Sequence, residues 1–408
     1  MRKTIFVTIL TGLFSLILPS CNDESVNVEE VTRQTILVYM PWSGTESYKG
    51  LYPNFLQNLD SIESAIVRRD GLARTRLLVF ISESATASKL YEVLYDKKVC
   101  SRKQLKTYAG RDYTTAEGIA EILSDTKNAA EALNYALFVG GHGTGWTHIA
   151  DWKDYPYGIA KRHQTRRRDG MEGSGDFEQT RFLGSVDDMR FTIDIETLAE
   201  GLRLSGTRMQ YILFDDCYMA NAEVAYELRD VTNFLIASTS EVMSFGMPYA
   251  DMWKSLNSQT PDYKGAVDAF HNFYTNYRTP CGTLSAIDCR QMEALAEVMK
   301  QINNRHTFDE SQFESLQILD GFRETLFFDM GNYVSKLCTD PYLYEKFTTQ
   351  LSKTVVSKAA TETIYSYIYS APLYIAVETF SGITISDPSR NIVAQRGKEH
   401  TSWWKATH

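Results

Sequence analysis

The chain has 408 residues, of which 43% are hydrophobic, 23% charged and 12% aromatic, and its formal net charge is −9. This composition is typical of a globular protein and excludes a largely disordered, collagen-like or low-complexity chain. The acidic balance argues against a general nucleic-acid-binding protein, which would need a basic face. The length leaves room for one large domain or two ordinary ones.

The N-terminus has the features of an export signal. Arg2 and Lys3 precede an apolar run of 14 residues over 5–18. This run is shorter than the roughly 20 residues that a transmembrane helix needs and is typical of a signal peptide. We therefore expect residues 1–20 to be removed from an exported protein.

A lipid anchor is the predicted fate of the new N-terminus. Residues 18–21 read LPSC, which resembles a bacterial lipobox, whose Cys becomes the lipidated first residue. We expect a lipid on Cys21, a polar tether over 21–33, and a location in the bacterial cell envelope, at the outer membrane or cell surface. The alternative is an ordinary secretory cleavage near residue 20, with Cys21 incidental.

Short apolar runs alternate with amphipathic helical patterns through the first 240 residues. Strands are predicted at 36–40, 77–81, 91–95, 135–139, 211–214 and 234–238, and the strand at 91–95 is expected to lead into a short edge hairpin. Helices are predicted from Pro53 through Ile66, from a capping box at Thr114 through Ala130, from Asp194 through Leu202, and directly after Cys217. Apolar strands alternating with helices indicate an α/β fold, with a mostly parallel sheet of about six strands covered by helices on both faces.

Two further regions complete the predicted organisation. The alternation stops over 151–190, which is rich in charge and glycine, and a long insert of this kind in a compact domain is usually functional or disordered. Residues 261–408 are expected to be mainly helical, with short strands near 284–287 and 383–385. This C-terminal region either forms a separate domain or packs back on the sheet of the domain over 34–260.

The chain has six cysteines and no C-x-x-C pair, so a zinc finger and a thioredoxin motif are unsupported. If Cys21 carries lipid, the remaining five cannot all pair, and at least one stays a free thiol in an oxidising compartment. Three full pairings are open to the four cysteines outside the candidate site, and Cys281 and Cys289 are close enough in sequence to bridge. We expect buried thiols instead. These four are Cys100, Cys281, Cys289 and Cys338.

Two loops at predicted strand ends carry candidate catalytic groups. His142 lies in a glycine-rich loop over 140–145, and Cys217 follows the strand over 211–214. In an open α/β sheet, ligands bind outside the carboxyl ends of the strands. A helix starting directly after Cys217 would favour the thiolate, and the glycines let backbone N–H groups approach a reacting carbonyl. A Cys–His dyad is therefore predicted; the alternatives are a turn histidine and a buried core cysteine.

Other chemistries lack their motifs. The glycine-rich loop does not fit G-x-G-x-x-G, because Trp146 stands where the last glycine is needed. No G-x-S-x-G or H-E-x-x-H sequence occurs, so serine-hydrolase and zinc-peptidase readings are unsupported.

The two loops resemble the signatures of the clostripain-like cysteine peptidases, a family of the caspase-like clan that includes gingipain and legumain. The matching segments are FVGGHG at 138–143 and FDDCYMA at 214–220. The resemblance covers residues 34–250 well and continues weakly to the end. It implies a caspase-like three-layer sandwich with His142 and Cys217 as the dyad and the backbone N–H groups of Gly143 and Cys217 as the oxyanion hole. In this clan the histidine is expected mainly to protonate the leaving amine.

The resemblance also bears on substrate choice. Asp215 matches the family's acid at the base of the S1 pocket, where a carboxylate would pair with Arg or Lys at P1. The alternative is that Asp215 caps the helix after Cys217. Family members with basic specificity carry a second acid before a glycine, where this chain has Phe245; Glu241 is the nearest acid. An aromatic wall at Phe245 could still hold Arg by stacking. Asp216 replaces a small residue common in the family.

Family members often mature by cutting themselves after a basic residue between the His and Cys elements. We expect self-cleavage near Arg166, Arg167 and Arg168, within the insert. Further basic candidates are Lys153, Lys161, Arg162 and Arg181. The alternative is a solvated basic loop that is never cut.

The predicted function is a cysteine endopeptidase that cleaves protein or peptide substrates after Arg or Lys. Two alternatives remain: a catalytically silent caspase-fold surface lipoprotein that acts as a binding module, and a clan peptidase with a non-basic P1 preference. The membrane would be contacted through the lipid alone. No cofactor is expected; some family members need calcium, and the acids here form no EF-hand loop.

Overall fold

The computed structural model describes residues 31–45, 48–110, 112–153, 189–258, 260–367 and 373–408. Residues 32–408 form one compact unit. Its centre is a sheet of nine strands in the order β10-β8-β7-β6-β5-β1-β2-β3-β4. The predicted signal peptide, Cys21 and the basic candidates Arg166, Arg167 and Arg168 lie outside the described residues.

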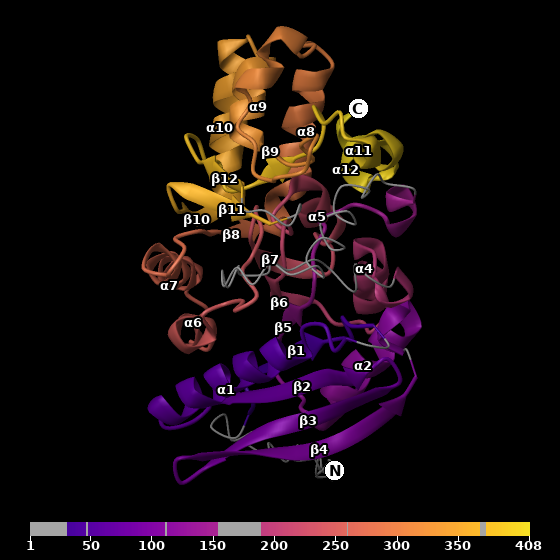
Figure 1. Ribbon diagram of the computed structural model, residues 1–408, viewed down its shortest axis with the longest axis vertical. Coiled ribbons are helices and arrows are strands. Elements are labelled where there is room, and N and C mark those ends of the chain that lie inside the picture. Colours follow the sequence, from indigo (N-terminus) through magenta and orange to yellow (C-terminus); the bar gives the residue numbers. More distant parts are fainter. Residues whose placement is uncertain (1–30, 46–47, 111, 154–188, 259, 368–372) are drawn as a thin grey trace, which may run out of the picture. The chain divides into compact units, whose positions relative to one another are not determined.

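Five parallel strands form the middle of the sheet, and antiparallel strands extend it on both sides (Figure 1). The parallel strands are β1 (Gln34–Met40), β2 (Thr75–Ser84), β5 (Asn134–Gly140), β6 (Met209–Asp215) and β7 (Thr232–Ala237). Every residue of β1 is buried, as expected for a strand covered on both faces.

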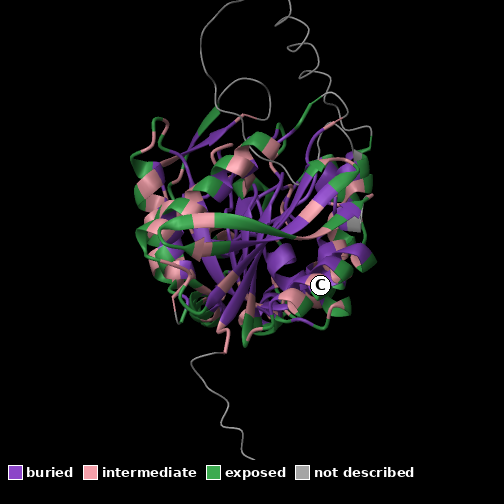
Figure 2. Cartoon of the chain, turned by 90° about the horizontal axis from the view of Figure 1, so that it is seen from below, coloured by how far each residue is buried: buried purple, intermediate pink, exposed green. Residues whose placement is uncertain are grey.

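Helices cover both faces of this sheet. One face carries α1 (Tyr52–Arg68), α6 (Tyr249–Leu256) and α7 (Tyr263–Thr275); the other carries α2 (Ala116–Ala129), α4 (Ile195–Leu204) and α5 (Ala222–Glu227). Figure 2 shows the buried sheet between these helices, whose outer sides are exposed. Each helix thus places its apolar side on the sheet, and the three layers follow from the sequence pattern.

The hairpin at one edge of the sheet is longer than predicted. The expected short hairpin is two long antiparallel strands, β3 (Ala87–Asp96) and β4 (Val99–Ala109). Most of β4 is exposed and polar, with Arg102, Lys103 and Lys106 along it. Backbone pairing holds this strand in place and its charges suit an edge, so hydrophobic patterning could not reveal it.

The C-terminal region packs back on the sheet. Strands β8 (Thr283–Asp288) and β10 (Val355–Ala360) pair antiparallel beyond β7. Helices α8 (Met292–Asn303), α9 (Met330–Leu337) and α10 (Pro341–Thr354) follow, and α11 (Ile392–Gly397) and α12 (Ser402–Thr407) end the chain. Two small sheets pair β9 (Phe328–Asp329) with β13 (Thr384–Ile385), and β11 (Thr363–Ser366) with β12 (Leu373–Ala376).

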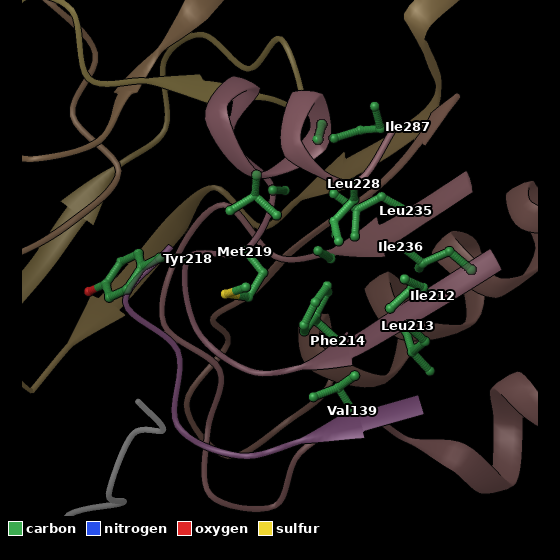
Figure 3. Close-up of a cluster of buried hydrophobic side chains, with 14 of the residues drawn as sticks. Val139, Ile212, Leu213, Phe214, Tyr218, Met219, Leu228, Leu235, Ile236 and Ile287 are labelled. Carbon is green, nitrogen blue, oxygen red and sulfur yellow. The ribbon is translucent and has the colours of Figure 1, made fainter. Parts of the chain in front are cut away.

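A continuous apolar core surrounds the carboxyl ends of β5, β6 and β7 (Figure 3). Val139, Phe214 and Met219 point into it, whereas the Tyr218 ring lies to one side of the cluster. The core therefore holds the strand ends on which the two candidate loops are mounted.

Candidate active site

His142 and Cys217 follow neighbouring parallel strands at matched positions. Gly140, at the end of β5, is in register with Asp215, at the end of β6. Each candidate residue lies two positions beyond its member of this pair. Since the strands run in the same direction, both loops leave the sheet at the same edge.

The two loops are in contact. A Cβ atom built on Gly143 would lie 2.2 Å from the carbonyl oxygen of Cys217 and 2.9 Å from its nitrogen. Only glycine allows this approach, which explains one of the glycines around His142. The structure thus brings together the histidine loop and the cysteine loop that the sequence predicts as one site.

The thiol of Cys217 is buried and contacts the backbone of Val242. Its exposed fraction is 0%, and that of His142 is 9%. The backbone N–H of Val242 points at the sulfur, with 3.2 Å between Val242 N and Cys217 Sγ. A thiolate would accept such a bond. A substrate carbonyl reaches this sulfur only after a displacement of the groups that cover it.

The prediction of a helix directly after Cys217 is wrong. Tyr218 adopts a left-handed conformation with φ of 59°, and α5 begins only at Ala222. Asn221 is the N-cap: its side chain accepts from the N–H of Val224 and donates to the carbonyl of Tyr218. The cysteine therefore lies on a sharp turn before the helix. The N–H group that contacts its sulfur comes from Val242 and not from the N-terminus of α5.

Asp215 does not cap that helix, so this alternative for its role is also wrong. Its carboxylate is fully buried and accepts from the N–H of Met247 at 2.9 Å and from the Tyr249 hydroxyl at 3.1 Å. Asp215 thereby fixes the loop over 245–249, which enters α6, against the end of β6.

Phe245 is half-buried and packs against aromatic rings of α7. Its ring stacks on Phe273 with 5.0 Å between centroids and lies 6.2 Å from Tyr277. The side-chain amide of Asn58 donates to its carbonyl at 2.7 Å. Phe245 is therefore the first residue of the loop over 245–249, which the hydrogen bonds to Asp215 fix in place.

The other two acids near the cysteine are buried elsewhere. Asp216 is fully buried and lines a small cavity with Tyr39, Gly140 and Asp194. Asp216 thus lies against the histidine loop, whose first residue is Gly140. Glu241 is 2% exposed and accepts from the Tyr218 hydroxyl and from the N–H of Tyr367.

One ionic cluster beside the site had no signal in the sequence. His148 contacts Glu196 at 2.9 Å and Asp151 at 3.1 Å, and the hydrogen bond with Glu196 raises the pKa of His148 to about 9. Burial raises the pKa of Asp194, whose Oδ1 accepts from the N–H of Ile149. These contacts join the chain before residue 154 to the chain after residue 188. The partners lie far apart in sequence, so no spacing rule could pair them.

The four described cysteines outside the site are free thiols, and all but Cys100 are buried as expected. Cys281, Cys289 and Cys338 are buried, and Cys100 is half-buried. Within the described ranges, no group of three or more His, Cys, Asp or Glu side chains is arranged to hold a metal ion. Among the same residues, no helix is both long and apolar enough to cross a bilayer.

Comparison with protein families gives one match. The model of the clostripain family matches residues 169–377. A search of curated proteins found no match.

Solved structures extend the similarity over nearly the whole chain. A secreted C11 cysteine protease from Bacteroides thetaiotaomicron, called iotapain, is 42% identical, with a TM-score of 0.81, and the match covers 93% of this chain and 99% of that one. A clostripain from the same species, in complex with the peptide inhibitor BTN-VLTK-AOMK, is 51% identical, with a TM-score of 0.52, over 54% of this chain and 97% of that one.

A third structure supports the fold alone. An inactive zymogen C11 protease from Parabacteroides distasonis is 24% identical, with a TM-score of 0.73, over 93% of this chain and 99% of that one. The predicted fold class and the predicted cysteine peptidase activity are confirmed by these matches. The chain therefore belongs to the clostripain family of cysteine peptidases.

Proposed function

We propose that this peptidase is an endopeptidase that cleaves after Arg or Lys, with Cys217 as nucleophile and His142 as its partner. The observation that carries the proposal is the register of β5 with β6. Gly140 pairs with Asp215 across the two strands, and His142 and Cys217 each follow two positions later. The contact between Gly143 and Cys217 supports the same pairing.

In the proposed reaction, the Cys217 thiolate attacks the carbonyl carbon of the scissile bond. The backbone N–H groups of Gly143 and Cys217 stabilise the resulting oxyanion. His142 gives a proton to the leaving amine as the C–N bond breaks, which leaves a thioester on Cys217. Water then attacks the thioester while His142 takes its proton, and the C–S bond breaks to release the acid product, which restores the Cys217 thiolate and the protonated His142.

The preference for a basic P1 residue rests on Asp215. A buried carboxylate at the edge of the site would pair strongly with a guanidinium or ammonium group. The inhibitor bound to the similar Bacteroides clostripain carries Lys next to its AOMK group, by its name. Phe245 would supply a ring on which an Arg side chain stacks.

We also propose self-cleavage between the two loops, near Arg166, Arg167 and Arg168. The burial of Cys217 is in keeping with a precursor, since a fully buried thiol must be uncovered before it attacks a substrate. Comparing intact masses of the wild type and Cys217→Ala would test this proposal; an uncut, active wild type would overturn it.

Export with a lipid on Cys21 completes the proposal. The similar Bacteroides protease is described as secreted, which supports export. Cys21→Ser should release the protein from the membrane fraction when it is expressed in a bacterial host with its leader. A mutant that stays in the membrane fraction would count against the lipid.

The decisive experiment is digestion of a peptide library by residues 22–408, as wild type, Cys217→Ala and His142→Ala. Cuts made only by the wild type, after Arg or Lys, would support the proposal. Cys289→Ala is the matched control, because Cys289 is equally buried and lies outside the site. Cuts after other residues would favour a peptidase with a non-basic P1 preference. This is the second candidate function, because the chain has Phe245 where family members with basic specificity have a second acid.

A further inference from the structure

We propose that Glu241 is a positioning residue for Cys217, and that it acts through the hydroxyl of Tyr218. The inference rests on the proposed role of Cys217. It starts from three consecutive residues, 240–242, each of which contacts the turn formed by Cys217 and Tyr218.

The contacts of this segment alternate between backbone and side chain. The carbonyl of Ser240 accepts from the N–H of Tyr218 at 3.0 Å, and the N–H of Val242 points at Cys217 Sγ at 3.2 Å. Between them, Glu241 Oε1 accepts from the Tyr218 hydroxyl at 2.8 Å. The bond between Glu241 and Tyr218 therefore joins the segment over 240–242 to the turn at Cys217 and Tyr218, the same two segments that the backbone contacts join.

The turn needs such a restraint. Tyr218 has a φ of 59°, a conformation that costs free energy in any residue with a Cβ. This φ sets the direction in which the chain after Tyr218 leaves the Cys217–Tyr218 peptide. The Tyr218 ring stacks on Phe327, with 5.1 Å between centroids, and lies 5.9 Å from Phe322. The rings fix the plane of Tyr218, and Glu241 fixes its far end.

The donor keeps its proton, and the acceptor is held in orientation. Burial, with the nearby Glu241, raises the pKa of Tyr218 well above its usual value, so the hydroxyl keeps its proton. The second oxygen of Glu241 accepts from the N–H of Tyr367 at 3.1 Å, which orients the carboxylate. The segment is anchored to β8 as well, because Thr283 Oγ1 accepts from the N–H of Thr239 at 3.0 Å.

The test uses Tyr218→Phe, which removes the hydroxyl and keeps the stacked ring, and Glu241→Gln, which keeps the shape. In Glu241→Gln the amide oxygen stays on Tyr367, so an NH₂ group faces the Tyr218 hydroxyl. The NH₂ group can donate to the Tyr218 oxygen, but the Tyr218 proton loses its carboxylate acceptor and the charge-assisted bond is gone. Each variant should lower kcat about tenfold and leave KM within about twofold, because the bond orients the nucleophile and does not touch the substrate. The double variant should be no worse than either single one.

Two further readouts separate positioning from a merely structural role. The rate at which iodoacetamide alkylates Cys217 in the cut protein should fall about as much as kcat at neutral pH, while the unfolding midpoint changes little. Tyr108→Phe is the matched control: it also removes a tyrosine–carboxylate bond, 2.8 Å from Tyr108 Oη to Asp125 Oδ2, but outside the site, and should leave both rates unchanged.

Unchanged kcat and an unchanged alkylation rate in Tyr218→Phe would overturn the inference. So would a double variant whose loss of kcat is the sum of the two single losses, if the unfolding midpoint falls in parallel. If the wild type cleaves no peptide at all, the proposed function fails. The alkylation rates would then still decide whether Glu241 and Tyr218 control the reactivity of Cys217.

Discussion

Gly143 lies so close to Cys217 that the carbonyl oxygen of the cysteine occupies the place where a side chain at 143 would begin. The contact is with backbone, which cannot rotate away as a flexible side chain can. Any residue other than glycine must therefore push the histidine loop and the cysteine loop apart.

Gly143→Ala should abolish most of the peptidase activity and leave the fold intact. We expect kcat/KM to fall by at least about 100-fold, which corresponds to about 2.7 kcal/mol, because the N–H of residue 143 and His142 both move relative to Cys217. The measurement is steady-state cleavage of an Arg peptide. Gly206→Ala is the control for a strained glycine outside the site: nothing lies within 4 Å of a Cβ there, but its φ is 63°, so the variant should lose stability and keep its kcat/KM. Wild-type rates in Gly143→Ala would contradict the proposed oxyanion hole.

Asp215→Asn should change which peptides are cut. The asparagine oxygen can still accept from the N–H of Met247, so the loop over 245–249 keeps one anchor. The charge is lost, and kcat/KM for Arg and Lys peptides should fall about 100-fold relative to peptides with neutral P1 residues. Tyr249→Phe removes one donor to the same carboxylate and keeps its charge, so it should retain the basic preference. Equal losses for all peptides in Asp215→Asn would indicate a structural role only.

Thiol labelling should report the state of the segment over 154–188. Cys217 is fully buried and Cys100 is half-buried at the edge hairpin. In a variant held uncut by Arg166→Gln, Arg167→Gln and Arg168→Gln, iodoacetamide should label Cys100 faster than Cys217. In the cut wild type the order should reverse, because Cys217 becomes accessible and is the activated thiol. Peptide mapping by mass spectrometry gives both rates; the same order in both proteins would argue against a cover that moves.

The His148 cluster predicts a pH dependence of stability. The pKa of His148 is raised from 6.5 to about 9 in the folded chain, mainly by the hydrogen bond with Glu196. A raised pKa means that the folded state binds the proton more tightly, so this stabilisation is fully present below pH 6.5 and is lost as the pH rises to about 9.

His148→Gln should remove that dependence. Its urea midpoint should lie below that of the wild type at pH 6, and the two should converge near pH 9.5. His271→Gln is the control, because His271 contacts a backbone carbonyl, at 3.1 Å, and no carboxylate. A constant difference between His148→Gln and wild type across this range would show that the charge of His148 does not matter.

The sequence predicted the parts of the fold that depend on burial. The central strands are nearly continuous apolar runs, and β1, β5 and β6 lie where those runs do. The two-residue strand β13 lies within the short strand expected near 383–385. The full length of the polar edge strand β4 was not predicted, because backbone pairing forms this strand without a hydrophobic pattern.

The candidate site was predictable in its residue types and not in its turns. His142 and Cys217 were found because each follows an apolar strand. The left-handed φ of Tyr218 moved the start of α5 away from Cys217, and no local pattern marks such a residue when it is not glycine. The bond between Glu241 and Tyr218 joins residues from different loops and required the folded chain to be seen.

The adjacency of β5 and β6 has a consequence for a divided chain. Residues 154–188 connect these two strands, which pair in the middle of the sheet. A cut anywhere in that connection would leave a noncovalent heterodimer whose subunit interface is the core itself. Dissociation and unfolding would then be a single event, and the unfolding temperature would rise with protein concentration, whereas that of the uncut chain would not.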